Sequence, residues 1–130
     1  LLEITSELKP LYHASACVVS NYFVSIVNLG ISMMEKVGIE KKDALQALLP
    51  LIKGTLNNIE DVGVPTALTG PIARGDIMTL ESQIKVMENT SKEVIPLYKQ
   101  LGMYTVQVSE EKGTINTNNA ANFKKILEVK

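Results

Sequence analysis

Polar side chains recur along one side of an otherwise apolar stretch, residues 10–34, which contains no Asp, Glu, Lys or Arg. Because each residue of a helix turns by about 100°, several of them fall within one stripe. The stripe consists of His13, Cys17, Ser20, Val24 and Asn28, with Asn21 at its edge. Burying such polar groups unpaired costs about 1 to 3 kcal/mol each, so the stripe should face other polar groups, water or a ligand.

His13 is the single histidine and the one side chain that changes charge near neutral pH, which makes it a candidate proton donor or acceptor. A histidine satisfied within a core or an interface is the structural alternative, and serines can bond back to their own helix. Cys17 lies one turn from His13, but an oxyanion hole and a third orienting group have no visible source. Ser20 would lie roughly 10 Å from His13 along the axis, too far for a nucleophile and its base. With one His and one Cys, no metal site is expected.

A second candidate is the stretch LTGPIARGD, residues 68–76, which lies between long helical patterns. Pro71 forces Gly70 away from helical angles, and Gly75 permits a reversal before Asp76 caps the next helix. Arg74 is then held on a short, stiff corner, where its planar fork of donors suits a carboxylate or a phosphate. The alternative is that Arg74 pairs with Asp76, Glu81 or a helix C-terminus and only fixes the corner. The stretch matches neither the dinucleotide fingerprint nor the P-loop.

Composition excludes several classes of function. The formal net charge is -1 and no basic stripe interleaved with aromatic residues occurs, so nucleic acid is not an expected partner. Cys17 is the only cysteine, which rules out an intrachain disulfide and favours a reducing, cytoplasmic location. The apolar stretch is long enough to suggest a membrane span, but it carries too many polar groups for a lipid-facing helix. We therefore expect no membrane, and instead a buried central helix covered by neighbours on several sides.

Helical patterns account for most of the chain, and no run of alternating strand residues is left over. With two Phe and no Trp, the core must rest on aliphatic residues, as is typical of helices packed on helices. At 130 residues, one domain is expected. Gly38 closes the first helix, and a second helix covers residues 40–63, kinked or divided at Pro50 and ended by Gly63. Asp76 caps a third helix. A fourth runs from Lys92 to about Val108, capped by Thr90 or Ser91, with Pro96 in its first turn or just beyond and Gly102 at modest cost, and a short last helix begins near Asn118.

The pairing of KPLYHASACVVSNYFVSIVNLG with LTGPIARGD resembles a family of predicted bacterial oxidoreductases, over nearly the whole chain. In that family a Rossmann-like NAD(P)-binding domain precedes a helical domain of unassigned function. The helical half is similar to the C-terminal domains of 6-phosphogluconate dehydrogenase and ketopantoate reductase relatives. The resemblance implies an all-α bundle around a long central N-terminal helix, which closes a cleft over the nicotinamide and the substrate.

The resemblance also assigns roles to single residues. It implies that His13 polarises or protonates a substrate oxygen at the mouth of the cleft and that Asn21, two turns on, is the matching amide donor. Substrate-binding residues would be Tyr12, Thr69, the Gly70 backbone and Arg74, the last for a small anionic substrate. The chain departs from the related dehydrogenases at one position. Many of them have a lysine one turn before a helix asparagine, and Cys17 occupies that position here. A lysine-type proton donor is therefore not expected.

The resemblance implies that NAD(P) is bound mainly by an N-terminal domain outside these residues, since GxGxxG and a parallel-strand pattern do not occur in them. Residues 1–9 would be the linker from that domain, and residues 10–130 the helical substrate and dimerisation domain. The expected partners are this Rossmann-like domain and a second copy in a homodimer, and the fragment alone is expected to bind no cofactor and to be inactive. The alternative function is a non-catalytic helical dimerisation or interaction module.

Overall fold

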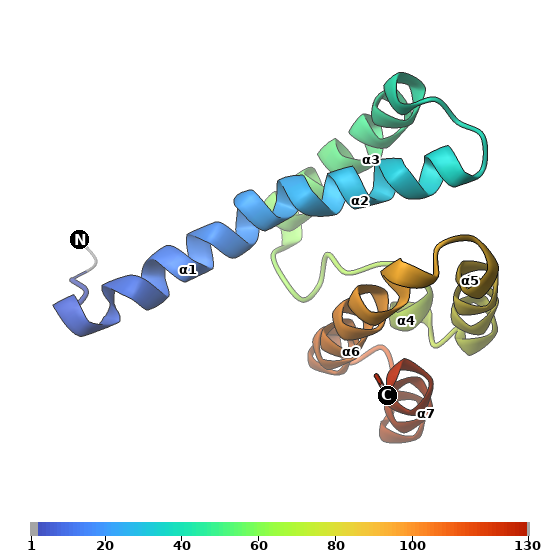
Figure 1. Ribbon diagram of the computed structural model, residues 1–130. Helices are drawn as coiled ribbons and strands as arrows, with labels where there is room; N and C mark the ends of the chain where they lie inside the picture. Colours follow the sequence, from blue (N-terminus) through green and yellow to red (C-terminus); the bar gives the residue numbers. More distant parts are fainter. Residues whose placement is uncertain (1–2, 130) are drawn as a thin grey trace. The chain divides into compact units, whose positions relative to one another are not determined.

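A computed structural model describes residues 3–129 of the chain as helices joined by short connections, with no strand among them (Figure 1). The all-α fold class predicted from the sequence is therefore confirmed. The elements are η1 (Ser6–Leu8), α1 (Lys9–Val19), α2 (Asn21–Lys36), α3 (Lys41–Val62), α4 (Pro71–Arg74), α5 (Ile77–Thr90), η2 (Lys92–Val94), α6 (Ile95–Lys112) and α7 (Thr117–Leu127).

The chain divides into two compact units, Leu1–Ala47 and Leu48–Lys130. The division falls within α3, just before Pro50. Proline has no backbone N–H and cannot donate to the carbonyl of Gln46, which weakens the helix at this turn. The helix nevertheless runs unbroken from Lys41 to Val62, so the division into two short helices that Pro50 suggested does not occur.

The long N-terminal helix of the first unit is interrupted once, at Ser20. This residue has φ -117° and ψ -70°, outside ideal helical values, and it separates α1 from α2. The hydrogen bonds continue through the interruption: the Ser20 N–H donates to the Ala16 carbonyl over 3.0 Å, and the Ser20 carbonyl accepts from the Val24 N–H over 3.2 Å. The helix ends where the sequence predicts, because Gly38 follows with a φ of 89° that favours glycine.

Within the first unit, this helix is not buried as the sequence predicts. None of the residues of α1 is buried, and Ile31 is the one buried residue of α2. The reason is the small size of the first unit, in which α1 and α2 adjoin end to end and only the first turns of α3 follow. The apolar side chains left exposed on α1 and α2 are Leu11, Tyr12, Val18, Val19, Tyr22, Phe23, Val24 and Ile26.

By length and composition alone, the helical stretch Ser6–Lys36 could cross a membrane. The same criterion is met by core helices of soluble proteins and by signal sequences, so it decides little by itself. A helix covered by another protein subunit would also carry a long uncharged surface. The serines and asparagines along this stretch argue against a lipid-facing span.

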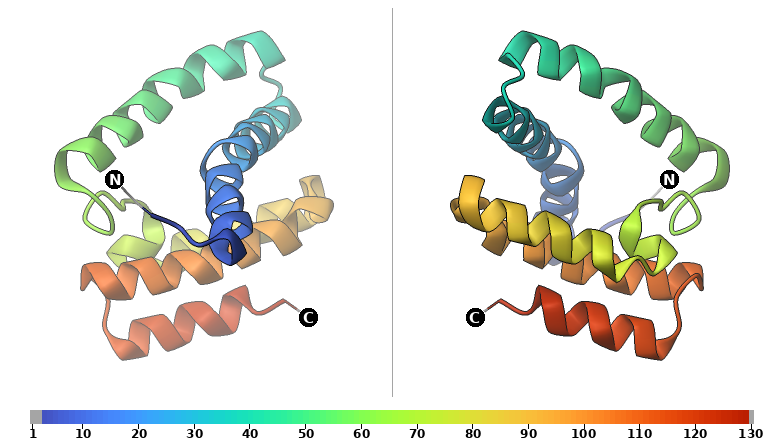
Figure 2. Two further views of the ribbon diagram at one scale, coloured as in Figure 1. Left: turned by 90° about the vertical axis from the view of Figure 1, so that its left-hand side faces the viewer. Right: turned by 90° about the vertical axis from the view of Figure 1, so that its right-hand side faces the viewer.

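The core of the second unit lies where α4, α5, α6 and α7 meet. Phe123 and Leu127 of α7 are almost completely buried, as are Val106 of α6 and Leu80 of α5. Figure 2 shows α6 and α7 side by side, and they share the most extensive helix contact in the chain. Gly102 permits this approach: a Cβ at that position would lie 2.8 Å from a methyl carbon of Leu127.

Helix limits in the second unit follow the local signals closely. Helix α5 begins after Asp76 and α6 has Pro96 in its first turn, as predicted. The short segment η2 precedes α6, with Ser91 before it but without a side-chain cap bond. Helix α6 continues to Lys112, beyond the predicted end near Val108, and stops at a left-handed Gly113. Helix α7 begins one residue before Asn118, with the Asn116 side chain accepting from the Asn119 N–H over 2.8 Å.

Candidate functional site

The LTGPIARGD corner has the backbone that its glycines and proline predict. Gly70 has φ 97° and ψ -179°, and Gly75 is left-handed with φ 71° and ψ 22°. Between them Pro71 opens the single turn α4, in which the Arg74 N–H donates to the Gly70 carbonyl over 3.1 Å. The Asp76 N–H then donates to the Pro71 carbonyl over 2.8 Å, which closes the corner. The backbone that carries Arg74 is therefore stiff.

The inner side of α4 anchors this corner to the core. Ile72 and Ala73 are buried, and α4 packs on both α5 and α6. From α6, the buried Ser109 hydroxyl donates to the Ile72 carbonyl over 3.4 Å and lies 3.3 Å from the Thr114 hydroxyl. Buried polar groups need such partners, so Ser109 connects α6 to α4 and restrains the turn.

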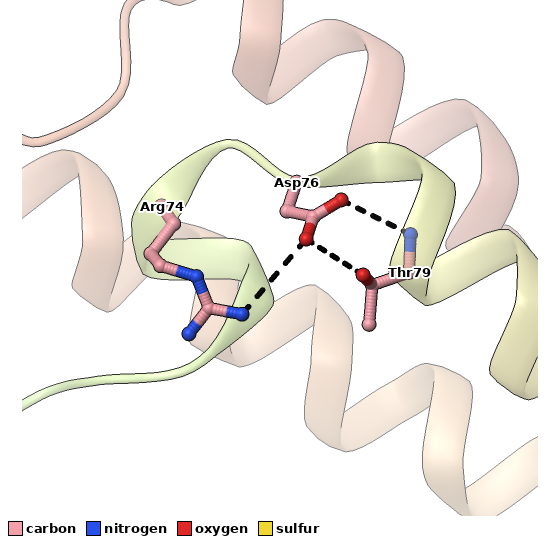
Figure 3. A network of polar contacts seen from close by, with 3 residues as sticks. All are labelled: Arg74, Asp76 and Thr79. Atoms are coloured by element: carbon pink, nitrogen blue, oxygen red, sulfur yellow. Dashed lines mark hydrogen bonds and ion pairs between the residues drawn. The ribbon is translucent and has the colours of Figure 1, made fainter.

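Asp76 caps the N-terminus of α5 (Figure 3). Its carboxylate accepts from the Thr79 backbone N–H over 3.1 Å and from the Thr79 hydroxyl over 2.6 Å. The hydroxyl bond and then the N–H bond lower the pKa of the Asp76 carboxyl, with a smaller lowering by the Arg74 guanidinium. Asp76 is thus ionised at neutral pH and occupied by its role as a cap.

Arg74 is attached to a fixed backbone but carries a largely free guanidinium. Its Nη2 atom lies 3.9 Å from Asp76 Oδ2, the long limit of an ion pair, and its side chain is 61% exposed. An exposed pair at this distance contributes little to stability. The pairing with Asp76 that the sequence offered as a structural alternative is therefore present but weak, through the single Nη2 contact drawn in Figure 3.

Thr69, one residue before Gly70, lines a pocket that the sequence did not predict. The pocket has a volume of about 200 Å³ and a mainly apolar lining. Its residues come from the end of α3, the connection that follows it, and α6: Thr55, Ile59, Val64, Ala67, Leu68, Thr69 and Val108. The connection contains a cis peptide bond between Val64 and Pro65. Beside the pocket, Lys112 Nζ donates to the Leu68 carbonyl over 2.5 Å.

Sequence signals for this pocket are weak. Val108 and Lys112 are four residues apart on one face of α6, which the helical period alone could have shown. Their contact with residues 64–69 joins parts of the chain about forty residues apart, as the 44-residue separation of Lys112 and Leu68 illustrates. Patterns among neighbouring residues in the sequence do not predict a contact over this separation.

The remaining predicted site residues belong to the first unit. Tyr12 and His13 are adjacent on α1, with ring centroids 5.9 Å apart and planes inclined by 51°. Asn21 begins α2, eight residues later, or roughly 12 Å along the axis. All three are exposed. The six predicted site residues therefore form two sets. The first unit contains Tyr12, His13 and Asn21, and the second contains Thr69, Gly70 and Arg74. A cleft shared by the two sets stays a prediction.

Other polar side chains of the stripe and its neighbourhood have local partners or face solvent. The Ser15 hydroxyl donates to the Tyr12 carbonyl over 2.7 Å and the Ser25 hydroxyl to the Asn21 carbonyl over 3.4 Å, as serines in helices commonly do. Cys17 is a free, exposed thiol. Within residues 3–129, no group of three or more His, Cys, Asp or Glu side chains is placed to hold a metal ion.

The sequence of this chain matches one known family. The family DUF2520, described as a domain of unknown function, matches residues 1–105, so the chain belongs to this family. The match includes both sets of predicted site residues and ends within α6. Neither the curated proteins nor the solved structures contain a match to the chain.

Proposed function

We propose that this DUF2520 domain is the helical, substrate-side half of a cytoplasmic NAD(P)-dependent oxidoreductase, and that it also pairs subunits. Its fold would then be that of the C-terminal domains of 6-phosphogluconate dehydrogenase and ketopantoate reductase relatives. The cofactor would be held mainly by a Rossmann-like domain, and the helical domain alone would be inactive.

The observation that carries the proposal is the uncovered, two-sided surface of α1 and α2. Leu11, Val18, Tyr22 and Ile26 follow one another at intervals of seven, four and four residues and lie on one side of the helix. Each is at least 44% exposed. A monomeric protein rarely leaves so long an apolar stripe uncovered, which favours a protein surface packed against it. His13 is rotated by about 200° from Leu11 and so lies on the opposite side.

This arrangement gives the two sides of one helix different tasks. The apolar stripe would pack against a second copy, in the manner of helices that meet along a repeating apolar seam. The polar stripe with His13 and Asn21 would remain available to line a cleft. A helix that is apolar on one side and bears a titratable group on the other suits a domain with two tasks. Such a domain pairs subunits and contributes residues to a substrate site.

Nicotinamide chemistry requires residues beyond this chain. Dinucleotide sites of the Rossmann type use a parallel sheet and a glycine-rich turn at a helix N-terminus. Residues 3–129 contain no strand, so they do not fit such a site. Hydride transfer would be supplied by the cofactor on the other domain, and this chain would bind and orient the substrate.

The proposed tasks of the residues follow from their chemistry. Arg74 would hold an anionic group of the substrate through its free N–H donors, with the Thr69 hydroxyl and the Gly70 backbone beside it. His13 would hold or deliver a proton at the substrate oxygen, and Asn21, two turns on, would be the matching amide donor. Tyr12, tilted against the His13 ring, would border the mouth of the cleft.

The test uses the full-length protein that carries this domain. NADPH and NADH binding is measured by fluorescence titration, and cofactor oxidation is then followed against a panel of small oxo acids. Arg74→Ala should raise KM by roughly 10- to 100-fold, the value of a charge-assisted hydrogen bond, whereas Arg74→Lys should recover part of the loss. His13→Gln should lower kcat by roughly 100-fold or more. Failure to bind either cofactor would refute the oxidoreductase proposal, and unchanged kinetics in both variants would refute the site.

A second candidate function is an interaction module without catalysis. The serines bonded to their own helix favour it, because these polar groups are satisfied without a ligand. Under this proposal Arg74→Ala and His13→Gln would lower the melting temperature or dissociate the assembly and leave ligand binding unchanged. Measuring melting temperature beside the kinetics separates the two functions.

A further inference from the structure

We infer that the pocket in the second unit binds the aliphatic part of a small monocarboxylate, whose carboxylate is held by Lys112. The inference goes beyond the proposed function: this acid is a ligand separate from the substrate that Arg74 would hold. The binding itself requires neither cofactor nor catalysis.

The pocket is built from three segments that the chain brings together. Thr55 and Ile59, one turn apart on α3, form one wall. The rest of the lining comes from Val64, Ala67, Leu68 and Thr69, which follow the end of α3, and from Val108 of α6. Apolar atoms provide most of the lining, so the part of a ligand that enters should be apolar.

The size of the pocket limits what it can hold. Sites for drug-sized ligands measure about 300 to 1,000 Å³, and this pocket of about 200 Å³ is smaller. A nucleotide or a bulky aromatic ligand would not fit. A short, branched aliphatic chain is the class of ligand that suits both the volume and the lining.

Lys112 provides a positive charge at the side of this apolar surface. It lies one turn after Val108 on the same face of α6, and its ammonium donates to the carbonyl of Leu68, itself a lining residue. The residue is half-buried, and no carboxylate of residues 3–129 lies within 4.0 Å of its ammonium. Lys124, by contrast, pairs with Glu110 over 3.2 Å.

The donors of Lys112 favour an anion as its partner. An ammonium has three N–H donors, and the Leu68 carbonyl takes one of them. A half-buried positive charge beside apolar surface gains most from an opposite charge, because screening by water is reduced there. The exposed Thr69 hydroxyl, which also lines the pocket, offers a further donor. An amine would be repelled and a neutral amide held less tightly.

The experiment uses isovalerate as the probe and isovaleramide as its uncharged counterpart. Both are titrated into the isotope-labelled chain, and binding is followed by the amide resonances of residues 64–69 and of α6. Isovalerate should shift these resonances with a millimolar dissociation constant, and isovaleramide should bind at least tenfold more weakly. Lys112→Met should weaken isovalerate binding at least tenfold, whereas Lys112→Arg, which keeps the charge, should stay within about threefold of the parent.

Lys99→Met is the matched control. Lys99 is also on α6 and also donates to a backbone carbonyl, that of Glu128 over 3.5 Å, but it does not line the pocket. Its replacement should leave isovalerate binding unchanged. Thermal unfolding of each variant shows whether it is folded. If Lys112→Met does not fold, the comparison of the parent with Lys112→Arg and of the acid with the amide still tests the inference.

Three results would overturn the inference: no shift of these resonances by isovalerate, equal binding of acid and amide, or equal effects of the Lys112→Met and Lys99→Met changes. None of them depends on NAD(P)H. A chain that binds isovalerate as described while the full-length protein fails to bind NAD(P)H would leave the pocket intact and refute only the oxidoreductase proposal.

Discussion

Asp76 and Arg74, two residues apart on the LTGPIARGD corner, have different tasks at the scale of single side chains. Asp76 is engaged by two hydrogen bonds from Thr79, whereas Arg74 meets only a distant carboxylate oxygen. A rigid backbone with a free guanidinium is the arrangement expected of an anion-binding arginine. The sequence predicted both the cap and the turn, but it could not decide how far Arg74 pairs with Asp76, because that depends on rotamers rather than on spacing.

Asp76 should make stability depend on pH. Its pKa is lower in the folded chain than the ordinary value of 3.8, so its contribution is fully present above that value and is lost as the pH falls through the folded pKa. Thermal unfolding of the parent between pH 6 and pH 2 should therefore show a fall in melting temperature below about pH 4. Asp76→Asn keeps a capping side chain without the charge and should show a smaller fall.

The control for this prediction is Asp61→Asn, which removes an exposed carboxylate near the end of α3. It should leave the parent's pH dependence nearly unchanged. If Asp61→Asn and Asp76→Asn reduce the pH dependence of the melting temperature equally, the hydrogen bonds from Thr79 to Asp76 are not the source of that dependence.

At the scale of elements, the contact of α6 with α7 depends on a glycine whose role the sequence did not reveal. Gly102 is buried, and an added Cβ would meet the buried Leu127 side chain at 2.8 Å. The sequence predicted only a modest cost for a glycine inside a helix. The structure shows instead that the absence of a side chain is what lets the two helices approach.

Gly102→Ala should therefore destabilise the chain. Alanine favours a helix by about 0.5 to 1 kcal/mol over glycine, but overpacking against Leu127 costs about 1 to 3 kcal/mol, so the clash should prevail. Gly54→Ala is the control, because the residue is inside α3 and, apart from its chain neighbours and its own helix backbone, nothing lies within 4 Å of a Cβ there. Chemical denaturation should show Gly54→Ala at least as stable as the parent. Equal stabilisation by both changes would contradict the packing account.

Local signals and long-range contacts explain what the sequence could and could not predict. Gly38, Gly63 and Asp76 end or begin helices where predicted, because each acts through its own backbone or the next turn. The pocket beside Lys112 was missed because it joins distant segments. Pro50 predicted a kink or two short helices, and α3 runs through it as one helix, because one missing hydrogen bond does not outweigh the turns on either side. The kink stays a prediction.

At the scale of the whole molecule, the N-terminal helix is the part that the sequence described least well. Its apolar residues predicted a buried central position, and the first unit by itself leaves almost all of them exposed. Hydrophobicity in a sequence indicates that a surface needs a partner but does not indicate whether the partner belongs to the same chain. The proposed second copy would restore the burial that the pattern demands.

The chosen variants separate the two sides of this helix. Ile26 lies on the apolar stripe and Val24 on the opposite side, two residues away, and both are exposed, at 44% and 67%. Ile26→Glu places a charge in the proposed interface and should dissociate the dimer. Val24→Glu adds the same charge outside the interface and should leave it paired.

The most direct test is the mass of the chain in solution, measured by light scattering over a range of concentrations. The account predicts a particle of twice 14.2 kDa for the parent and for Val24→Glu, and one of 14.2 kDa for Ile26→Glu. A parent that remains at 14.2 kDa at every concentration, or that is recovered only with lipid vesicles, would contradict the claim that a second copy covers α1 and α2.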